Sequence, residues 1–402
     1  MLLRHRPFRL LWAAQLISSF GDAATWLALL ILTQRLTGST AAVAGTAVAI
    51  ALPQLVLGLL AGVMVDRWDR RRLLIASDLT RAGLVLGFLA VTTADRLWLL
   101  YGLAFATSAA ATFFNPARGV LVAEVLPADR LLSANSLSET SRVVAGVAGV
   151  ALAGVLAGEW TLSLVFVLDA ASFLVSAALV ARIRAPVAAT SEGRDAVGRE
   201  VVAGLRLVFG SRLLRGVVVA GSVAMLGLGA VNVLLVPYVV DVLGAPETWF
   251  GALEGAQVTA MVLAGAALAA VGARLRPTAL VSGGLLGLGA VVAAMAAVTQ
   301  VWQLVPLLFA VGWMITPVQA SVTTILQTEV PPRLRGRAQA SFSTLVGAAG
   351  LASMALAGGV AAAVGVRNVF LLSGLVAAAA GLASALAFRS PRPAAAAAPE
   401  PR

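Results

Sequence analysis

The sequence predicts an all-α membrane protein in which twelve transmembrane helices form two similar six-helix bundles. Three observations support this fold class: the composition, the number of apolar segments of membrane length, and the distribution of arginine. Of 402 residues, 60% are hydrophobic and 12% are charged, whereas soluble domains contain about 25% charged and about 45–50% apolar residues. The composition therefore excludes a soluble globular protein.

Twelve apolar segments are long enough to cross the hydrocarbon core of a bilayer, which takes about 20 residues of helix. Six lie in the first half of the chain: 8–36, 41–65, 73–94, 97–114, 138–158 and 162–180. Six lie in the second half: 213–240, 250–271, 278–299, 301–326, 338–363 and 368–388. The ninth and tenth meet at Thr299 and Gln300, and their joint length is too great for one crossing, so we expect a turn there. The short alternating segments of β-barrel strands are absent.

The arginines support the same count of spans. All 29 basic residues are arginine, and with a cytoplasmic N-terminus 24 of them fall on the cytoplasmic side. The opposite side has three, Arg35, Arg96 and Arg367, as the positive-inside rule requires. We therefore expect both termini in the cytoplasm and the protein in a bacterial inner (plasma) membrane. The net charge of +11 is explained by loops that face anionic lipid, so no nucleic-acid partner is expected.

A long polar interval divides the twelve spans equally. The predicted organisation is an N-terminal bundle over 1–184, a central cytoplasmic loop over 185–212, a C-terminal bundle over 213–389 and a disordered tail over 390–402, which is rich in proline and alanine. Two bundles joined by a loop are typical of transporters that rock around a central site.

The composition also excludes several kinds of chemistry. The chain has no cysteine and no lysine, and its one histidine, His5, precedes the first span. Disulfides, cysteine nucleophiles, Schiff-base lysines and the lysine-containing phosphate loop are therefore absent. We expect no enzyme activity, no catalytic residues, no cofactor and no metal site, and an ion gradient instead of ATP as the energy source.

One motif follows the second span. Residues 62–72 read Gly-Val-Met-Val-Asp-Arg-Trp-Asp-Arg-Arg-Arg, which resembles the signature of the major facilitator superfamily: glycine, three apolar residues, Asp-Arg, two residues and a basic pair. The resemblance implies the major facilitator fold, and it implies a gating latch between the cytoplasmic ends of the two halves, formed by Gly62, Asp66, Arg67, Arg70 and Arg71. The alternative is that any cytoplasmic loop collects arginine.

Further motifs in the first half of the chain resemble the drug-exporter branch of this superfamily, which includes macrolide efflux and enterobactin exporters. They are Phe-Phe-Asn-Pro-Ala-Arg at 113–118, Leu-Ser-Ala-Asn-Ser at 132–136, Phe-Val-Leu-Asp-Ala-Ala-Ser-Phe at 166–173 and Ser-Phe-Gly-Asp at 19–22. One position departs from the pattern, because Val150 occupies the place of the proline in the antiporter motif of the fifth helix.

Charged residues inside the predicted spans are candidate functional residues, because each is costly in hydrocarbon. Asp22, in the middle of the first span, could exchange a proton or contact substrate, or it could make a structural hydrogen bond. Glu254, near the outer end of the eighth span, could contact substrate or extend to the headgroups. The neutral candidates for substrate contacts, which could equally tie helices together, are Asn115, Asn232 and Gln319.

Two acid–arginine pairs have the i, i+3 spacing that places both side chains on one helix face. They are Asp78 with Arg81 in the third span and Glu139 with Arg142 in the fifth, and we expect both to be structural or gating ion pairs. Asp169 in the sixth span is expected to stabilise the fold.

The leading functional hypothesis is a secondary transporter that exports small amphipathic compounds in exchange for protons, by alternating access. Its expected partners are a small-molecule substrate, protons and membrane lipid, and it is expected to be a monomer. A siderophore or lysophospholipid transporter of the same fold is the alternative. A non-transporting membrane receptor or scaffold would be a different class, and it would have no need of a buried Asp22.

Overall fold

The computed structural model describes residues 2–127, 130–159, 161–183, 209–271, 275–330 and 335–388. These residues contain helices and no strand, and twelve of the helices are long and apolar enough to cross a membrane. The predicted fold class and number of spans are therefore confirmed. Most of the predicted central loop, up to residue 208, and the predicted tail at 390–402 lie outside the described residues.

The N-terminal half contains α1 (Arg6–Thr37), α2 (Thr40–Arg67), α3 (Arg70–Gly87), α4 (Leu97–Val125), α5 (Leu131–Glu159) and α6 (Leu162–Ala181). Capping residues set several of the boundaries. Gly38 ends α1 in the left-handed conformation with φ 58°, which glycine adopts without steric cost. Asp69 begins α3 by accepting a hydrogen bond from the backbone N–H of Arg72 at 2.9 Å.

The C-terminal half contains α8 (Arg212–Pro237), α9 (Trp249–Val271), α10 (Pro277–Met295), α11 (Leu304–Glu329), α12 (Arg335–Val364) and α13 (Val366–Phe388). A π-helical segment, η5 (Tyr238–Val242), follows α8. The turn expected between the ninth and tenth spans is confirmed, since α10 ends at Met295 and the 3-10 helix η7 (Val301–Gln303) leads into α11.

Several helices extend beyond their predicted spans, and α4 does so by the most residues. The fourth span was expected to end at residue 114, but α4 continues through Asn115, Pro116 and Arg118 to Val125. Arg118, which was counted among the arginines of the cytoplasmic side, therefore lies within α4, about two turns before the helix ends at Val125. The helix passes through Pro116, which is tolerated inside membrane-spanning helices because neighbouring groups satisfy the backbone groups that proline leaves free.

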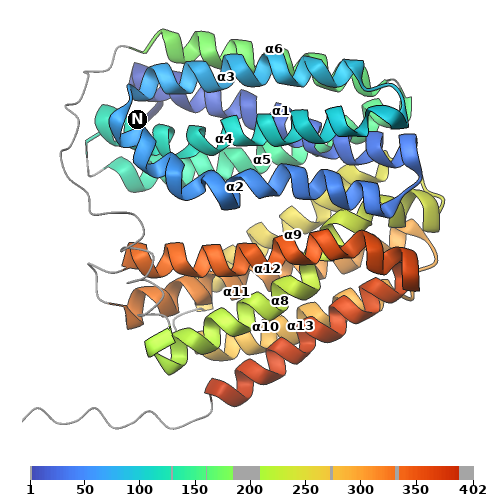
Figure 1. The fold of residues 1–402 in the computed structure, drawn as a ribbon. Helices are drawn as coiled ribbons and strands as arrows, with labels where there is room; N and C mark the ends of the chain where they lie inside the picture. Colours follow the sequence, from blue (N-terminus) through green and yellow to red (C-terminus); the bar gives the residue numbers. More distant parts are fainter. Residues whose placement is uncertain are drawn as a thin grey trace, which may run out of the picture.

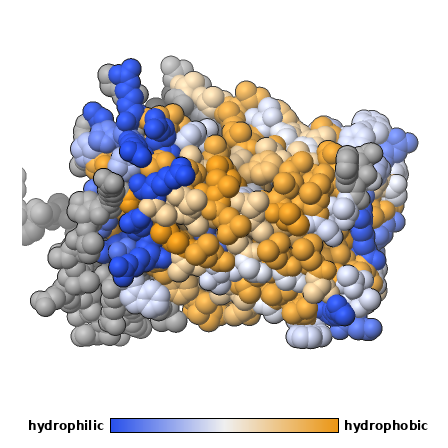
Figure 2. Space-filling view, turned by 90° about the horizontal axis from the view of Figure 1, so that it is seen from above, coloured by the Kyte–Doolittle hydropathy of each residue, from blue (hydrophilic) through white to orange (hydrophobic). Residues whose placement is uncertain are grey.

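The two halves lie side by side (Figure 1), and an apolar belt crosses the middle of the face drawn in Figure 2. We call the end that holds the N-terminus the arginine-rich end, because its helix ends carry Arg70, Arg71, Arg72, Arg212 and Arg215. The other end, which carries Arg35, Arg96 and Arg367, is the opposite end. Polar residues gather at both ends and leave the belt between them (Figure 2), as expected for a protein that spans a bilayer.

The buried apolar residues show where the halves meet. One cluster combines both halves and includes Leu30 of α1, Tyr238 of η5 and Phe370 of α13, all near the opposite end. Two further clusters lie towards the arginine-rich end, and each stays within one half: one contains Leu74 of α3 and the other Leu285 of α10. The halves therefore share a core at the opposite end and have separate cores at the arginine-rich end, where their helices diverge in Figure 1.

Polar contacts and close backbone approaches join the halves at the opposite end. Arg35 of α1 forms an ion pair with Glu247, which precedes α9, at 2.7 Å. Gln34 of α1 donates a hydrogen bond to the carboxylate of Asp241 in η5. Gly358 of α12 lies so close to Ala41 of α2 that a methyl group at Gly358 would overlap the Ala41 backbone. Glycine therefore permits the tight contact between α2 and α12.

Candidate functional site

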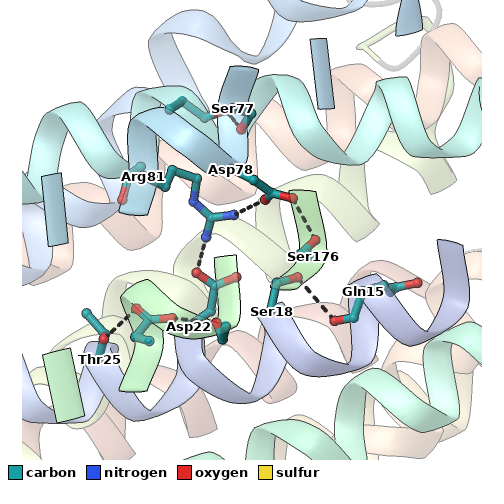
Figure 3. Close-up of polar contacts among 12 residues, drawn as sticks. Gln15, Ser18, Asp22, Thr25, Ser77, Asp78, Arg81 and Ser176 are labelled. Atoms are coloured by element: carbon teal, nitrogen blue, oxygen red, sulfur yellow. Dashed lines mark hydrogen bonds and ion pairs between the residues drawn. The ribbon is translucent and has the colours of Figure 1, made fainter. Parts of the chain in front are cut away.

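A charged cluster lies inside the N-terminal half, between α1, α3 and α6. Arg81 of α3 forms an ion pair with Asp22 of α1 and lies 4.0 Å from Asp78, one turn earlier on α3 (Figure 3). The Arg81 side chain is 4% exposed and that of Asp22 is 43% exposed. The guanidinium carbon of Arg81 also lies 4.0 Å from the centre of the Phe173 ring on α6, a cation–π geometry. Arg81 is therefore a buried cation, and Asp22 is its exposed partner.

Two more carboxylates surround this pair. Asp78 is 0% exposed and accepts a hydrogen bond from Ser176 of α6 at 2.6 Å through Oδ2, whereas its Oδ1 has no hydrogen-bond partner among the described residues. Asp169 of α6 is 1% exposed and accepts hydrogen bonds from Thr25 at 2.6 Å and from Ser172 at 3.2 Å. Three carboxylates thus share the neighbourhood of one guanidinium, and Asp169 joins α1 to α6 as a fold-stabilising residue would.

Helix α1 approaches α6 closely at Gly21. A methyl group at this position would overlap the carboxylate of Asp169 and lie 2.5 Å from the hydroxyl oxygen of Ser172. Gly21 directly precedes Asp22 in the Ser-Phe-Gly-Asp motif. The motif therefore places a small residue where α1 packs on α6 and a carboxylate where α1 faces Arg81.

A second polar group lies nearer the arginine-rich end. Glu139 and Arg142 form the predicted ion pair on α5, with Nε of Arg142 3.1 Å from Oε2 of Glu139. Arg118 of α4 donates a hydrogen bond to the side-chain oxygen of Gln15 on α1 at 2.5 Å. This contact of Arg118 was not predicted from the sequence, because the expected span ended before it. The only signal was the apolar run that resumes after Arg118, at 120–122.

Two cavities adjoin these groups. The first has a volume of about 380 Å³ and lies within the N-terminal half, where Gln15, Asp22, Arg81, Asn115 and Arg142 supply polar or charged side chains to its lining. The second has a volume of about 400 Å³ and is lined by both halves. Ala23, Trp26 and Gly146 line both cavities, so the two adjoin near the centre of the molecule.

The second cavity contains a carboxylate without a partner. Glu254, near the start of α9, is half-buried and lines this cavity together with Asn232 of α8 and Gln257 of α9. Glu254 forms no hydrogen bond or ion pair within the described ranges. Of the other polar candidates, Asn115 lines the first cavity, whereas Gln319 on α11 lines neither of the two. The structure therefore brings Asn232 and Glu254 together, and leaves Gln319 apart from them.

The predicted gating motif lies at the turn between α2 and α3. Gly62, Asp66 and Arg67 belong to the last turns of α2, and their side chains lie outside the described residues. Arg70 lies 3.8 Å from Glu124 of α4, and Nε of Arg71 donates to the carbonyl of Val180 on α6 at 3.3 Å. These contacts join helices within the N-terminal half. The latch between the two halves stays a prediction.

Comparisons with known proteins agree with this architecture. The family model for transmembrane secretion effectors matches residues 2–401. Macrolide efflux protein A of Streptococcus pyogenes is 22% identical over 373 residues, which cover 91% of this chain and 92% of that protein. The MFS-type transporter YfiS of Bacillus subtilis is 32% identical over 171 residues, which cover 42% of this chain and 40% of that protein.

The fold is also similar to that of solved transporters. A bacterial homologue of the human lysosomal transporter Spinster, crystallised in an inward-facing and unoccupied conformation, has a TM-score of 0.77 at 14% sequence identity. The match covers 95% of this chain and 97% of that one. The twelve helices, the two halves around a central cavity and the match over nearly the whole chain lead to one conclusion: the protein belongs to the transmembrane secretion effector family of the major facilitator superfamily of membrane transporters.

Proposed function

We propose that this transporter exports small amphipathic compounds from a bacterial cell and exchanges them for protons. The observation that carries the proposal is the position of Asp22, which faces the first cavity and at the same time forms an ion pair with the buried Arg81. An intramembrane charge is costly and marks a pathway or a pair. Asp22 both lines a cavity and forms an ion pair. A proton that reaches it from the cavity therefore acts directly on a buried contact between α1 and α3.

The ion pair offers a route for coupling. When Asp22 takes up a proton, its carboxyl group becomes neutral and its attraction for Arg81 falls. Arg81 then keeps Asp78, at 4.0 Å on the same helix, as its nearest carboxylate. The contact between α1 and α3 is thereby weakened while the charge on Arg81 remains compensated. Because α1 also lines both cavities through Ala23 and Trp26, this change reaches the substrate site.

The arrangement of the halves supports alternating access. We propose that the arginine-rich end faces the cytoplasm, following the positive-inside rule, and that the bundles over 1–184 and 213–389 rock about the shared core at the opposite end. The separate cores at the arginine-rich end then correspond to an inward-facing state. In this state the central cavities are reached from the cytoplasm, as export requires.

The chemistry of the cavity supports an amphipathic substrate. Most side chains that line the second cavity are apolar, among them Leu228, Val292 and Ile315, with a few polar groups between them. A cavity of this kind and size is typical of small-molecule sites. The macrolide efflux protein similar to this chain over most of its length is named for a substrate of this class.

The proposal is tested with the purified protein in liposomes under an imposed pH gradient. The compounds are a lipophilic cation, a macrolide, an anionic siderophore and a lysophospholipid. We expect uphill movement of at least one compound that depends on the gradient and is lost in Asp22→Asn. Asp95→Asn is the matched control, because Asp95 is an exposed aspartate in η3 (Ala94–Arg96) and lines neither cavity.

The outcomes separate the hypotheses. Transport of the siderophore or lysophospholipid alone would contradict the proposed substrate class but would still support a transport function. Transport that persists without a gradient, or that Asp22→Asn leaves unchanged, would contradict proton coupling through Asp22. Absence of movement for every compound would favour a receptor or scaffold.

A further inference from the structure

We infer that the exported compound carries a positive charge and that Glu254 is its counter-ion in the second cavity. This inference rests on the proposed function and adds a substrate class and a binding residue to it. The starting point is the balance of charges around the two cavities.

Four charged residues line the two cavities: Asp22, Arg81, Arg142 and Glu254. Three of them have a partner of opposite charge. Asp22 and Arg81 pair with each other, and Arg142 pairs with Glu139 through both Nε and Nη2. Glu254 has no such partner within the described ranges. The cavities therefore hold one uncompensated charge, and it is negative.

An anionic compound finds no complementary group in this arrangement. The Arg81 side chain is 4% exposed and pairs with Asp22, and the guanidinium of the half-exposed Arg142 is bound by Glu139. To bind an anion, the buried Arg81 would have to release Asp22, which is costly where water is excluded. An anion at the half-exposed Arg142 would meet the negative charge of Glu139 beside it. A cation instead pairs with Glu254 and breaks no existing contact.

The walls around Glu254 fit the remainder of such a compound. Trp26 and Phe250 place aromatic rings in the lining of the second cavity, and aromatic rings attract cations as well as apolar groups. Gln257 lies three residues after Glu254 on α9, and thus on the same helix face. Asn232 approaches from α8. The cavity thus combines a carboxylate, two neutral amides and apolar walls, which is the complement of an amphipathic cation.

Two probes of the same shape and opposite charge test the inference. Tetraphenylphosphonium is a permanent cation and tetraphenylborate a permanent anion, so neither depends on pH. We expect the purified full-length protein in detergent to bind the cation more tightly by equilibrium dialysis. In Glu254→Gln, affinity for the cation should fall by roughly tenfold or more, the effect of one charge–charge contact in a partly solvated cavity. Asp95→Asn removes the same charge from the surface and should leave binding unchanged.

A swap variant keeps the test independent of folding defects. Glu254→Gln combined with Gln257→Glu has the same composition as the wild type and moves the carboxylate by about one helical turn within the same cavity. The preference for the cation should return in this variant, whereas a purely structural role of Glu254 predicts no rescue.

The inference is overturned if the wild type binds the two probes equally, if it does not bind the cation, or if Glu254→Gln keeps the preference. Failure of the inference differs from failure of the proposed function. If only the inference fails, gradient-driven export of a neutral or anionic compound persists in the liposome assay. If the proposed function fails, no compound moves in that assay.

Discussion

Arg81 of α3 and Asp22 of α1 form an ion pair across 59 residues of sequence, with the arginine buried and the aspartate facing a cavity. The pair links the charged interior of the N-terminal half to the space where a substrate would bind. Its surroundings are asymmetric, because Asp78 and Asp169 are both buried next to it and, in the part of the chain that the structure describes, no second arginine pairs with either of them. This asymmetry leads to the first two predictions.

Removal of Arg81 should destabilise the protein, and removal of Asp22 in the same molecule should restore part of the loss. Arg81→Gln leaves Asp22, Asp78 and Asp169 without a cation, and breaking a buried pair from one side costs about 3–5 kcal/mol. The double variant Arg81→Gln with Asp22→Asn removes one of the unpaired carboxylates. Thermal unfolding in detergent should therefore rank the wild type first, the double variant second and Arg81→Gln last. A double variant less stable than Arg81→Gln would show that Asp22 and Arg81 act independently.

The protonation of Asp22 should be visible by infrared spectroscopy. As pH falls, more Asp22 is protonated, so the ion pair with Arg81 is present at higher pH and lost at lower pH. The carboxylic acid band of the wild type should therefore grow as pH decreases, and the difference spectrum against Asp22→Asn should contain that component. Asp95→Asn should retain it, because Asp95 is exposed and remote from the cluster. An identical pH dependence in wild type and Asp22→Asn would contradict a titrating Asp22.

Two adjacent glycines on α12 should differ sharply in their tolerance of a side chain. A Cβ at Gly358 would overlap the backbone of Ala41 on α2, whereas a Cβ at Gly359 meets no atom within 4 Å. We expect Gly358→Val to force the halves apart at the opposite end and to abolish transport. Gly359→Val carries the same change in helix propensity and should remain active.

Spin labels can report the separation of the halves in these variants. The chain has no cysteine, so cysteines can be placed at Trp68 and Leu275, which are both exposed at the arginine-rich end, one in each half. Because the bundles are proposed to rock, separation at the opposite end should bring them together at the arginine-rich end. Pulsed electron paramagnetic resonance should therefore show shorter distances between the two labels in Gly358→Val than in the wild type or Gly359→Val. Equal distance distributions in all three proteins would show that the contact between Gly358 and Ala41 does not hold the two halves together at the opposite end.

The ion pair between Arg35 and Glu247 should also hold the halves together at the opposite end, but more weakly than the contact at Gly358. The equilibrium concerned lies between the conformation in which the halves meet at that end and the one in which they separate there. The Arg35 side chain is 41% exposed, and exposed ion pairs are worth about 0–1 kcal/mol. Arg35→Ala should therefore change the ratio of these two conformations by up to about fivefold, measured with the same spin labels. Arg96→Ala is the matched control, since Arg96 lies at the same end but donates to the carbonyl of Ala90 within its own half. A larger effect of Arg96→Ala than of Arg35→Ala would refute this role for the pair.

Much of the architecture was predictable from the sequence, because it depends on local properties. Membrane span length and hydropathy are features of contiguous segments, so the twelve helices and the turn after α10 were correctly predicted. The two i, i+3 pairs were also predictable, since helix geometry places such residues together wherever the helix lies. Both lie within 4.0 Å in the structure.

The partners of single residues were decided by the tertiary structure. The sequence places Asp22 in a span, but its contact with Arg81 depends on how α1 and α3 are rotated about their axes and on how closely α1 packs on α6 at Gly21. Likewise, Arg118 binds Gln15 because α4 continues through Pro116, and Glu254 faces the second cavity because α9 packs beside it. Helix length and polarity are set by neighbours in the chain. Which faces of the helices meet is set by packing between distant segments, and neither spacing nor composition contains that information.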